Sequence, residues 1–349
     1  MNTPIQSVIS KLPLHELFSE TLLRSQQRFS RGLLEIDCPR EVDRICTSMR
    51  QLIFRDFRKK GVVVGLSGGI DSSTVAALAA RAMGPDRVIG LLMPEKDSSA
   101  ETLALSHLMA EHLGIKSKHE DISTMLEAAG CYRRRDDAIR LVVPEYGPGW
   151  KSKLVLPNVV DGESFRLFAI VTQSPNGEQI TRTLTLEASL GIVAATNFKQ
   201  RTRKMLEYFH ADRLNYAVAG TPNRLEYELG FFVKLGDGAA DFKPIAHLYK
   251  SQVYQLATYL GVPREILNRP PTTDTYSLPQ TQQEFYFCLP YELMDLMLYA
   301  QSHGYTPFEI AAEVGLRPDQ IERVFRDIDA KRRIANYLNA RPSLMEYVN

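Results

Sequence analysis

The chain has 349 residues, a length that allows one large α/β domain with additions or two smaller domains. Its 42 basic and 41 acidic residues leave a net charge of +1, which gives no electrostatic footprint for nucleic acid or for an anionic membrane. Four cysteines without a C-x-x-C pair argue against a zinc ribbon or a disulfide framework, and the first residues contain no signal peptide and no membrane span. We therefore expect a cytoplasmic protein with a small-molecule partner.

The N-terminal part of the chain, residues 1–60, has the apolar spacing of helices that pack on a main domain. The run Val62–Leu66 is β-branched and uncharged, which predicts a strand buried on both faces. Ser67-Gly-Gly-Ile-Asp-Ser72 follows it directly, and Thr74–Met83 then has the pattern of a helix. The sequence thus predicts a strand, a tight loop and a helix start in immediate succession.

This loop has the composition of an anion site. Its glycines let backbone N–H groups approach a phosphate closely, serine hydroxyls add donors, and the helix N-terminus contributes a partial positive charge. A carboxylate at Asp71 fits such a site if it holds Mg²⁺ between phosphates. The Walker pattern is excluded because no lysine follows the glycines.

The α/β pattern continues through the middle of the chain. Strands are predicted at Arg87–Pro94 and Lys116–Ile122 on either side of a helix at Ala100–Leu113. Between about residues 140 and 190, strands at Phe165–Gln173 and Gln179–Leu186, joined by an Asn-Gly turn, predict a β-hairpin insertion. Its role stays open between self-association, a lid and a passive elaboration. The fold class is therefore α/β, a doubly wound parallel sheet with flanking helices and this insertion.

A helix is predicted at Arg201–His210. The strand that follows it, Tyr216–Gly220, ends like the first one in a turn that carries a hydroxyl and a carboxylate. Since parallel strands end at the same edge of a sheet, Thr221 could reach the nucleotide and Glu226 could complete a Mg²⁺ site with Asp71. Beyond a helix at Lys250–Leu260 and a proline-rich turn, the pattern predicts a C-terminal helical extension, with helices at Tyr291–Gln301, Pro307–Val314 and Pro318–Leu338. Two of its helices are joined by a short turn, as in a helix-turn-helix DNA-binding motif. We do not predict DNA binding, because acidic residues in the first half of the second helix would face the DNA phosphates. We divide the chain into 1–60, 61–275 and 276–349.

Several motifs in this order resemble NAD synthetase, in the ammonia-dependent form, within the ATP pyrophosphatase superfamily. They cover most of residues 45 to 275. The motifs are Ser67-Gly-Gly-Ile-Asp-Ser72, Asn197-Phe-Lys-Gln-Arg201, Gly220-Thr-Pro-Asn-Arg-Leu-Glu226, Phe231-Phe-Val-Lys-Leu-Gly-Asp-Gly-Ala-Ala-Asp241, Lys250 and Pro270-Pro-Thr272.

The resemblance implies a residue-by-residue site. Catalytic roles fall to Asp71 and Lys250, and the metal ligands are Asp71 and Glu226. Arg201, Lys234 and Asp241 would contact deamido-NAD, and the family's homodimers imply a dimer here. The ATP site would consist of Gly65, Leu66, Ser67, Gly68, Gly69, Ile70, Asp71, Ser72, Thr221, Lys250 and Thr272.

The implied ligase reaction has a simple chemical reason. A carboxylate is a poor electrophile, so ATP adenylates it, pyrophosphate leaves, and ammonia then displaces AMP, while Mg²⁺ and lysine neutralise charge on the phosphate. The chain has no length for a glutaminase domain, so ammonia would be free or come from a separate glutaminase. Because the chain departs from the family pattern at Pro222 and at Gln282–Phe287, an adenylating amide ligase for another carboxylate stays an alternative. A tRNA-modifying relative and a nucleotide sensor are weaker ones.

Overall fold

The computed structural model describes residues 28–156, 168–272 and 275–346, so the helices predicted within residues 1–27 lie outside the described part. A parallel sheet of four strands forms the centre, with the order β3-β2-β1-β7. Its strands are β1 (Val62–Gly65), β2 (Val88–Leu92), β3 (Lys116–His119) and β7 (Ala217–Ala219). From β1 the chain moves outward to β2 and β3, then returns to place β7 on the other side of β1. The strand order therefore reverses between β1 and β7, and the prediction of a doubly wound sheet is confirmed.

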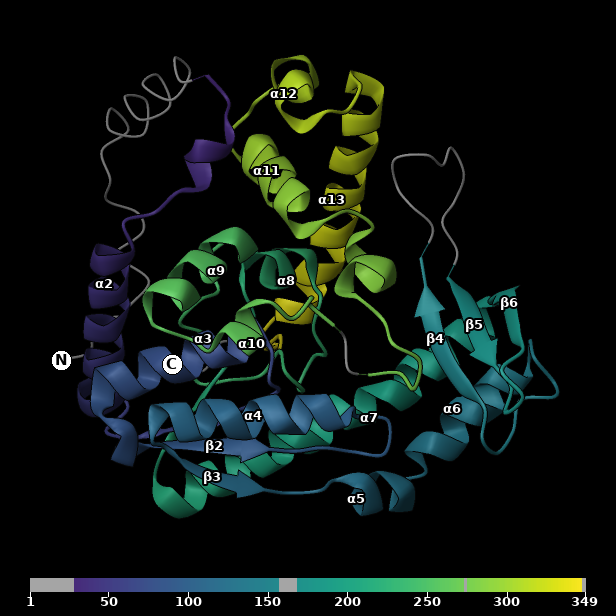
Figure 1. Cartoon of the computed structure of the whole chain (residues 1–349), viewed down its shortest axis with the longest axis horizontal. Helices are drawn as coiled ribbons and strands as arrows, with labels where there is room; N and C mark the ends of the chain where they lie inside the picture. Colours follow the sequence, from purple (N-terminus) through teal and green to yellow (C-terminus); the bar gives the residue numbers. More distant parts are fainter. Residues whose placement is uncertain (1–27, 157–167, 273–274, 347–349) are drawn as a thin grey trace.

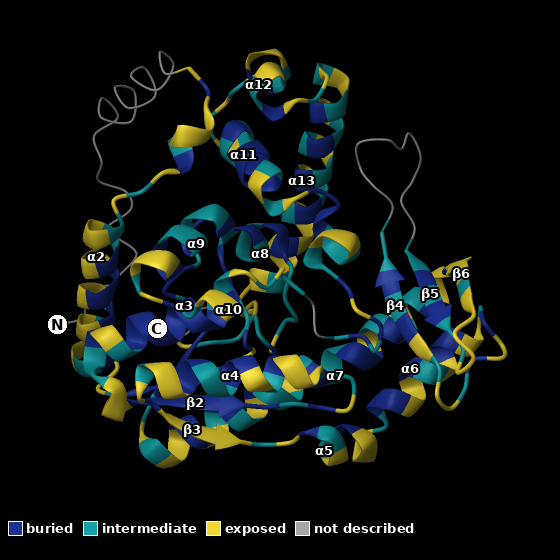
Figure 2. Cartoon of the chain, viewed as in Figure 1, coloured by how far each residue is buried: buried dark blue, intermediate teal, exposed yellow. Residues whose placement is uncertain are grey.

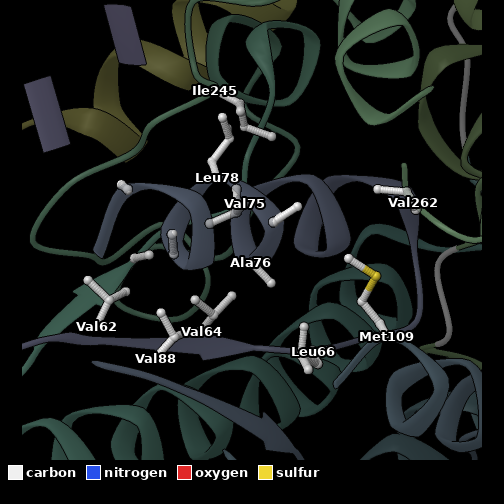
Figure 3. Close-up of a cluster of buried hydrophobic side chains, with 14 of the residues drawn as sticks. Val62, Val64, Leu66, Val75, Ala76, Leu78, Val88, Met109, Ile245 and Val262 are labelled. Atoms are coloured by element: carbon white, nitrogen blue, oxygen red, sulfur yellow. The ribbon is translucent and has the colours of Figure 1, made fainter. Parts of the chain in front are cut away.

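The alternation along β1 explains why helices cover both faces. Val62 and Val64 point into one hydrophobic core, and Val63 points into another on the opposite face. Figure 3 shows Val62 and Val64 beneath Val75 and Leu78 of the helix that follows the loop. The first core is covered by α2 (Cys38–Gln51), α3 (Ile70–Met83), α4 (Ala100–Leu113) and α9 (Lys250–Tyr259); the second by α5 (Ser123–Ala128), α6 (Cys131–Arg140) and α7 (Leu186–Leu214).

Figure 2 shows the consequence for the surface, because the outward sides of α2 and α4 are exposed while β2 is buried along its length. Among the described residues, no helix is long and apolar enough to cross a membrane. Short elements join the main ones. They are η2 (Arg31–Leu34), η3 (Leu52–Asp56), η4 (Pro85–Arg87), α8 (Arg224–Leu229), α10 (Arg264–Leu267) and η5 (Gln283–Phe287).

The insertion contains the predicted hairpin and one strand more. β5 (Ala169–Gln173) and β6 (Gln179–Thr183) pair antiparallel around the turn, and β4 (Lys151–Val155) pairs with β5 to make a second sheet. The sequence pattern did not predict β4, because turn-forming residues come directly before it. The predicted strand to Leu186 is too long, since α7 already begins there, with Thr185 as its N-cap accepting from the Ala188 N–H at 3.2 Å.

The C-terminal helices have a core of their own. α11 (Tyr291–Ser302), α12 (Pro307–Val314) and α13 (Pro318–Asn339) follow the predicted ranges closely and bury Met297, Ile321 and Val324 between them. In Figure 1 these helices lie together beyond α8 and α9, on the side away from β2 and β3. The predicted C-terminal helical extension is thus confirmed. The division of the chain into residues 1–60, 61–275 and 276–349 stays a prediction.

Candidate active site

A cavity of about 1020 Å³ opens at the carboxyl ends of β1 and β7, where the strand order reverses. Open α/β sheets bind ligands at such a switch point. The predicted residues that line it are Gly65, Leu66, Ser67, Gly69, Ile70, Asp71, Ser72, Thr221, Glu226, Lys250, Thr272, Arg201 and Lys234. Nearly the whole predicted site thus faces one cavity, which has the volume of a large ligand pocket.

The loop after β1 is folded by its own serines. Ser72 Oγ accepts a hydrogen bond from the Ser67 N–H at 3.2 Å and donates to the Gly69 carbonyl at 3.2 Å. Gly69 is the N-cap of α3 and has no side chain to occupy the first N–H groups of that helix. Those donors and the helix dipole therefore face the cavity, which is the arrangement that binds phosphate.

Asp71 and Lys250 meet at the centre of the site. The Lys250 ammonium donates to Asp71 Oδ2, and Asn223 Nδ2 donates to Asp71 Oδ1 at 3.0 Å. Asn223 also holds Glu226, because the Asn223 N–H donates to Glu226 Oε2 at 3.1 Å and Asn223 Oδ1 accepts from the Glu226 N–H at 3.2 Å. Asp71 and Glu226, which the sequence predicts to lie close together, are thus linked through Asn223. This residue is the N-cap of α8 and forms a capping box with Glu226.

The two carboxylates share one cation. Burial, and then the charge of Asp71, raise the pKa of Glu226 to about 8. Burial works against the charge of Lys250, but the carboxylates of Asp71 and Glu226 outweigh it and hold the lysine pKa above its usual value. Lys250 is 2% exposed, so this charge is deeply placed rather than solvated. Two carboxyl groups thus face a single ammonium group at the centre of the site.

The donor set fits Mg²⁺. No three His, Cys, Asp or Glu side chains converge into a metal cage within residues 28–156, 168–272 and 275–346. Mg²⁺ usually takes one or two carboxylates and completes its oxygen ligands with water and substrate phosphates. Asp71 and Glu226, beside a phosphate-binding helix N-terminus, offer that kind of partial set.

The three residues predicted to contact the dinucleotide do not lie together. Arg201 Nε donates to the Lys234 carbonyl at 3.3 Å, so these two lie together in the cavity wall. The Lys234 ammonium donates to the Tyr337 carbonyl at 2.9 Å and lies 4.2 Å from the centre of the Tyr337 ring. The C-terminal helix α13 therefore closes this end of the cavity.

Asp241 and Gly68 are the two predicted site residues outside the cavity lining. Asp241 Oδ2 accepts from the Val218 N–H at 2.8 Å, which extends the edge of β7, and Asp241 lines a separate hollow beside Lys234. Gly68 has φ +65°, and a Cβ there would lie 2.7 Å from the Thr102 carbonyl oxygen. Gly68 is therefore needed for the turn and for the close approach of α4.

Three functional candidates were not predicted. Asn223 could have been found from the Asn-x-x-Glu capping pattern before α8. Gln282, whose Nε2 donates to Glu226 Oε1 at 3.2 Å, and Arg269, whose Nη2 donates to Thr102 Oγ1 at 2.8 Å, both line the cavity. Their placement depends on tertiary packing, and no local pattern in the sequence signals it.

A buried ionic cluster fixes the wall next to this centre. Lys199 of α7 is fully buried and donates to Glu95 Oε1 at 2.8 Å, Asp97 Oδ2 at 2.7 Å and the Thr275 carbonyl at 2.7 Å. Arg135 also pairs with Asp97, at 2.5 Å. The three donors of one ammonium group thus join the loop after β2 to the loop after α10.

A glycine loop, an open helix N-terminus, two carboxylates and a lysine at the switch point are the features of a nucleotide-binding α/β protein. The model of the family NAD synthase matches residues 41–141 and 171–334. The chain belongs to the NAD synthase family, and the resemblance found in the sequence is confirmed.

Curated relatives extend over most of the chain. It is 58% identical over 312 residues to an NH(3)-dependent NAD(+) synthetase of Mesorhizobium japonicum, covering 89% of this chain and 98% of the relative. The protein of that name from Rhizobium meliloti is 55% identical, covering 92% and 96%. The one from Thermotoga maritima is 36% identical over 244 residues, covering 70% and 80%.

Solved structures agree on the fold. An NH3-dependent NAD synthetase from Campylobacter jejuni has a TM-score of 0.59 at 23% identity and covers 89% of this chain and 100% of its own. An NMN synthetase from Francisella tularensis has a TM-score of 0.63 at 21% identity, covering 90% and 100%. The family match omits residues 142–170, which contain β4 of the insertion.

Proposed function

We propose that the protein is a ligase that amidates deamido-NAD to NAD, with ATP and ammonia as co-substrates and AMP and pyrophosphate as products. The observation that carries this proposal is the Asp71–Lys250 pair at the open N-terminus of α3, with Glu226 held beside it by Asn223. The names of the curated relatives support the choice of deamido-NAD and ammonia.

In this reaction, the loop N–H groups and the first turn of α3 bind the phosphates of ATP. Lys250 holds positive charge where the α-phosphate is attacked, so charge that develops on its oxygens is stabilised by a group already in place. Asp71 and Glu226 would hold Mg²⁺, which supplies charge neutralisation on the phosphate oxygens. Thr221 and Thr272 complete the ATP site, while Arg201 and Lys234 bind the dinucleotide, with Asp241 assigned to it through the resemblance alone.

The decisive test supplies ATP, Mg²⁺, ammonium and deamido-NAD, and measures NAD, AMP and pyrophosphate. We expect all three products in equal amounts, and no NAD when glutamine replaces ammonium. Nicotinate mononucleotide is a matched acceptor, because it has the same carboxylate and lacks the AMP half. Pyrophosphate release without NAD, stimulated by another acid, would instead support a ligase for a different carboxylate.

The metal assignment is tested with Asp71→Asn. The change keeps the size of the side chain and removes its charge, so we expect AMP formation to be abolished with the fold intact. Asp86→Asn is the matched control, since Asp86 is exposed beyond the other end of α3. Unchanged AMP formation in Asp71→Asn would remove the metal role of this residue.

We further infer a homodimer through α7. Exposed apolar side chains recur along this helix, namely Leu186 at 76%, Leu190 at 61%, Met205 at 57% and Phe209 at 57% exposure. A monomer rarely leaves so much apolar surface along one element. Leu190 also lines the cavity, so a second copy on this surface would lie next to it. Sedimentation of Phe209→Glu, with Phe308→Glu on α12 as an exposed control elsewhere, should give a monomer only for the former, and a dimer in both would place the interface elsewhere.

A further inference from the structure

The N-terminus of α9 places the catalytic lysine, because Lys250 is the first residue of that helix. Helix starts usually carry Ser, Thr, Asp or Asn as the N-cap, whose side chain accepts from the first N–H groups. Here the N-cap residue is Tyr249, which does not belong to that group. The acceptors for these N–H groups come instead from a distant part of the chain.

Asp295 of α11 supplies them. Its Oδ1 accepts from the Lys250 N–H at 3.1 Å, and its Oδ2 accepts from the Ser251 N–H at 2.7 Å. Asp295 is fully buried, so this carboxylate faces the helix start without competition from solvent. One side chain of the C-terminal extension thus holds the backbone of the residue whose ammonium contacts Asp71.

Aromatic pairs also join α9 to α11. Tyr254 stacks on Tyr291 with ring centres 5.2 Å apart and planes 12° from parallel, and Tyr249 lies 6.0 Å from Tyr299. These rings, and the buried Val253, Leu256 and Ala257 on the core side of α9, hold the helix in place. The two hydrogen bonds to Asp295 are directional, so they set the position of the helix start more closely than apolar contacts do.

We propose that Asp295 is a positioning residue for adenylation, acting through the backbone of Lys250, so that the C-terminal extension is part of the catalytic apparatus. The proposal rests on the function proposed above for Lys250. Asp295 touches no substrate, and its effect passes through the place where the Lys250 side chain leaves the helix. Other residues of the same extension contact side chains of the site directly, since Gln282 donates to Glu226 and the Tyr337 carbonyl accepts from Lys234.

A double-mutant cycle with Asp295→Asn and Lys250→Met distinguishes a positioning effect on Lys250 from an effect on the stability of the fold alone. Asparagine keeps the shape but presents an N–H₂ group to one of the two backbone donors, so one hydrogen bond is lost. We expect kcat for pyrophosphate release to fall about tenfold or more while KM for ATP changes less than about threefold, because binding of the ground state is retained. In the Lys250→Met background the same change should have no further effect, since residues that act as a unit are non-additive.

Thr306→Ala is the matched control. Thr306 caps α12 within the same extension, accepting from the Glu309 N–H at 3.4 Å, and its loss should lower the melting temperature without changing kcat. If Thr306→Ala lowers kcat as much as Asp295→Asn, or if the losses from Asp295→Asn and Lys250→Met multiply, the positioning role is refuted. Should Asp295→Asn not fold, Asp295→Ser, which is smaller and keeps one acceptor, takes its place in the same cycle.

The readout distinguishes this inference from the proposed function. Pyrophosphate release can be followed with whichever carboxylate the wild-type protein accepts. An absence of NAD from deamido-NAD would overturn the proposed function and leave the cycle measurable with another acid. Multiplying losses in the cycle would overturn the role of Asp295 and leave the ligase activity standing.

Discussion

The buried cluster around Lys199 allows a quantitative test of how the cavity wall is held. Lys199→Met keeps most of the length of the side chain and removes its charge from three acceptors. Asp97 would still be neutralised by Arg135, whereas Glu95 would keep only the Tyr132 hydroxyl, which donates at 2.8 Å. Removing one partner from a buried ion pair costs about 3–5 kcal/mol, and because only one carboxylate is stranded we expect about 3 kcal/mol.

The free energy of unfolding in urea measures this cost. Lys118→Met is the matched control, because Lys118 is exposed on β3 and such surface changes stay within about 0.5 kcal/mol. Adding Glu95→Gln to Lys199→Met removes the stranded charge, so the double variant should recover part of the loss. A Lys199→Met protein within about 1 kcal/mol of wild type, or a double variant less stable than the single one, would refute this account of the cluster.

Other outcomes can be measured on single variants. Gly68→Ala should abolish ATP binding in calorimetry, since its Cβ would lie 2.7 Å from the Thr102 carbonyl oxygen at φ +65°; retained affinity would mean that the loop can relax. Lys234→Ala should raise KM for the dinucleotide more than KM for ATP, and an effect confined to ATP would remove its substrate role. Burial raises the pKa of Asp295 from 3.8 to about 6, so the folded state holds a proton that the unfolded state lacks between these values. Stability should therefore fall by roughly 3 kcal/mol as the pH rises through this window, and Asp295→Asn should lack that component; identical pH profiles would contradict it.

The sequence predicts those parts of the molecule whose signals are local. The β-branched run before Ser67, the glycines after it and the helix pattern beyond coincide over about twenty residues, and the structure has a strand, loop and helix there. Glu226 was placed near Asp71 by topology, because two parallel strands end at one edge. The two carboxylates are linked through Asn223, which hydrogen-bonds to both and which hydrophobic periodicity does not identify.

The parts that were missed depend on packing between distant segments. Lys199 meets partners 102, 104 and 76 residues away, and Asp295 meets Lys250 45 residues away. The start of α7 was missed for a different reason. Gly191 weakens the helical pattern there, yet a Cβ at this position would lie 2.8 Å from the Ala138 side chain, so the glycine serves the close contact of α6 with α7.

The length of α7 has a consequence for how this protein can vary. Its residues line the cavity from Ser189 to Glu207, and the same helix carries Lys199 into the buried ionic cluster. Each residue turns an α-helix by about 100°, so inserting or deleting one residue near Gly191 would rotate every later side chain by that angle. Arg201 would leave the cavity and Lys199 would leave its partners in one event. The helix can therefore accept changes of residue, but a change of length within it would disrupt the ion cluster and the cavity wall together.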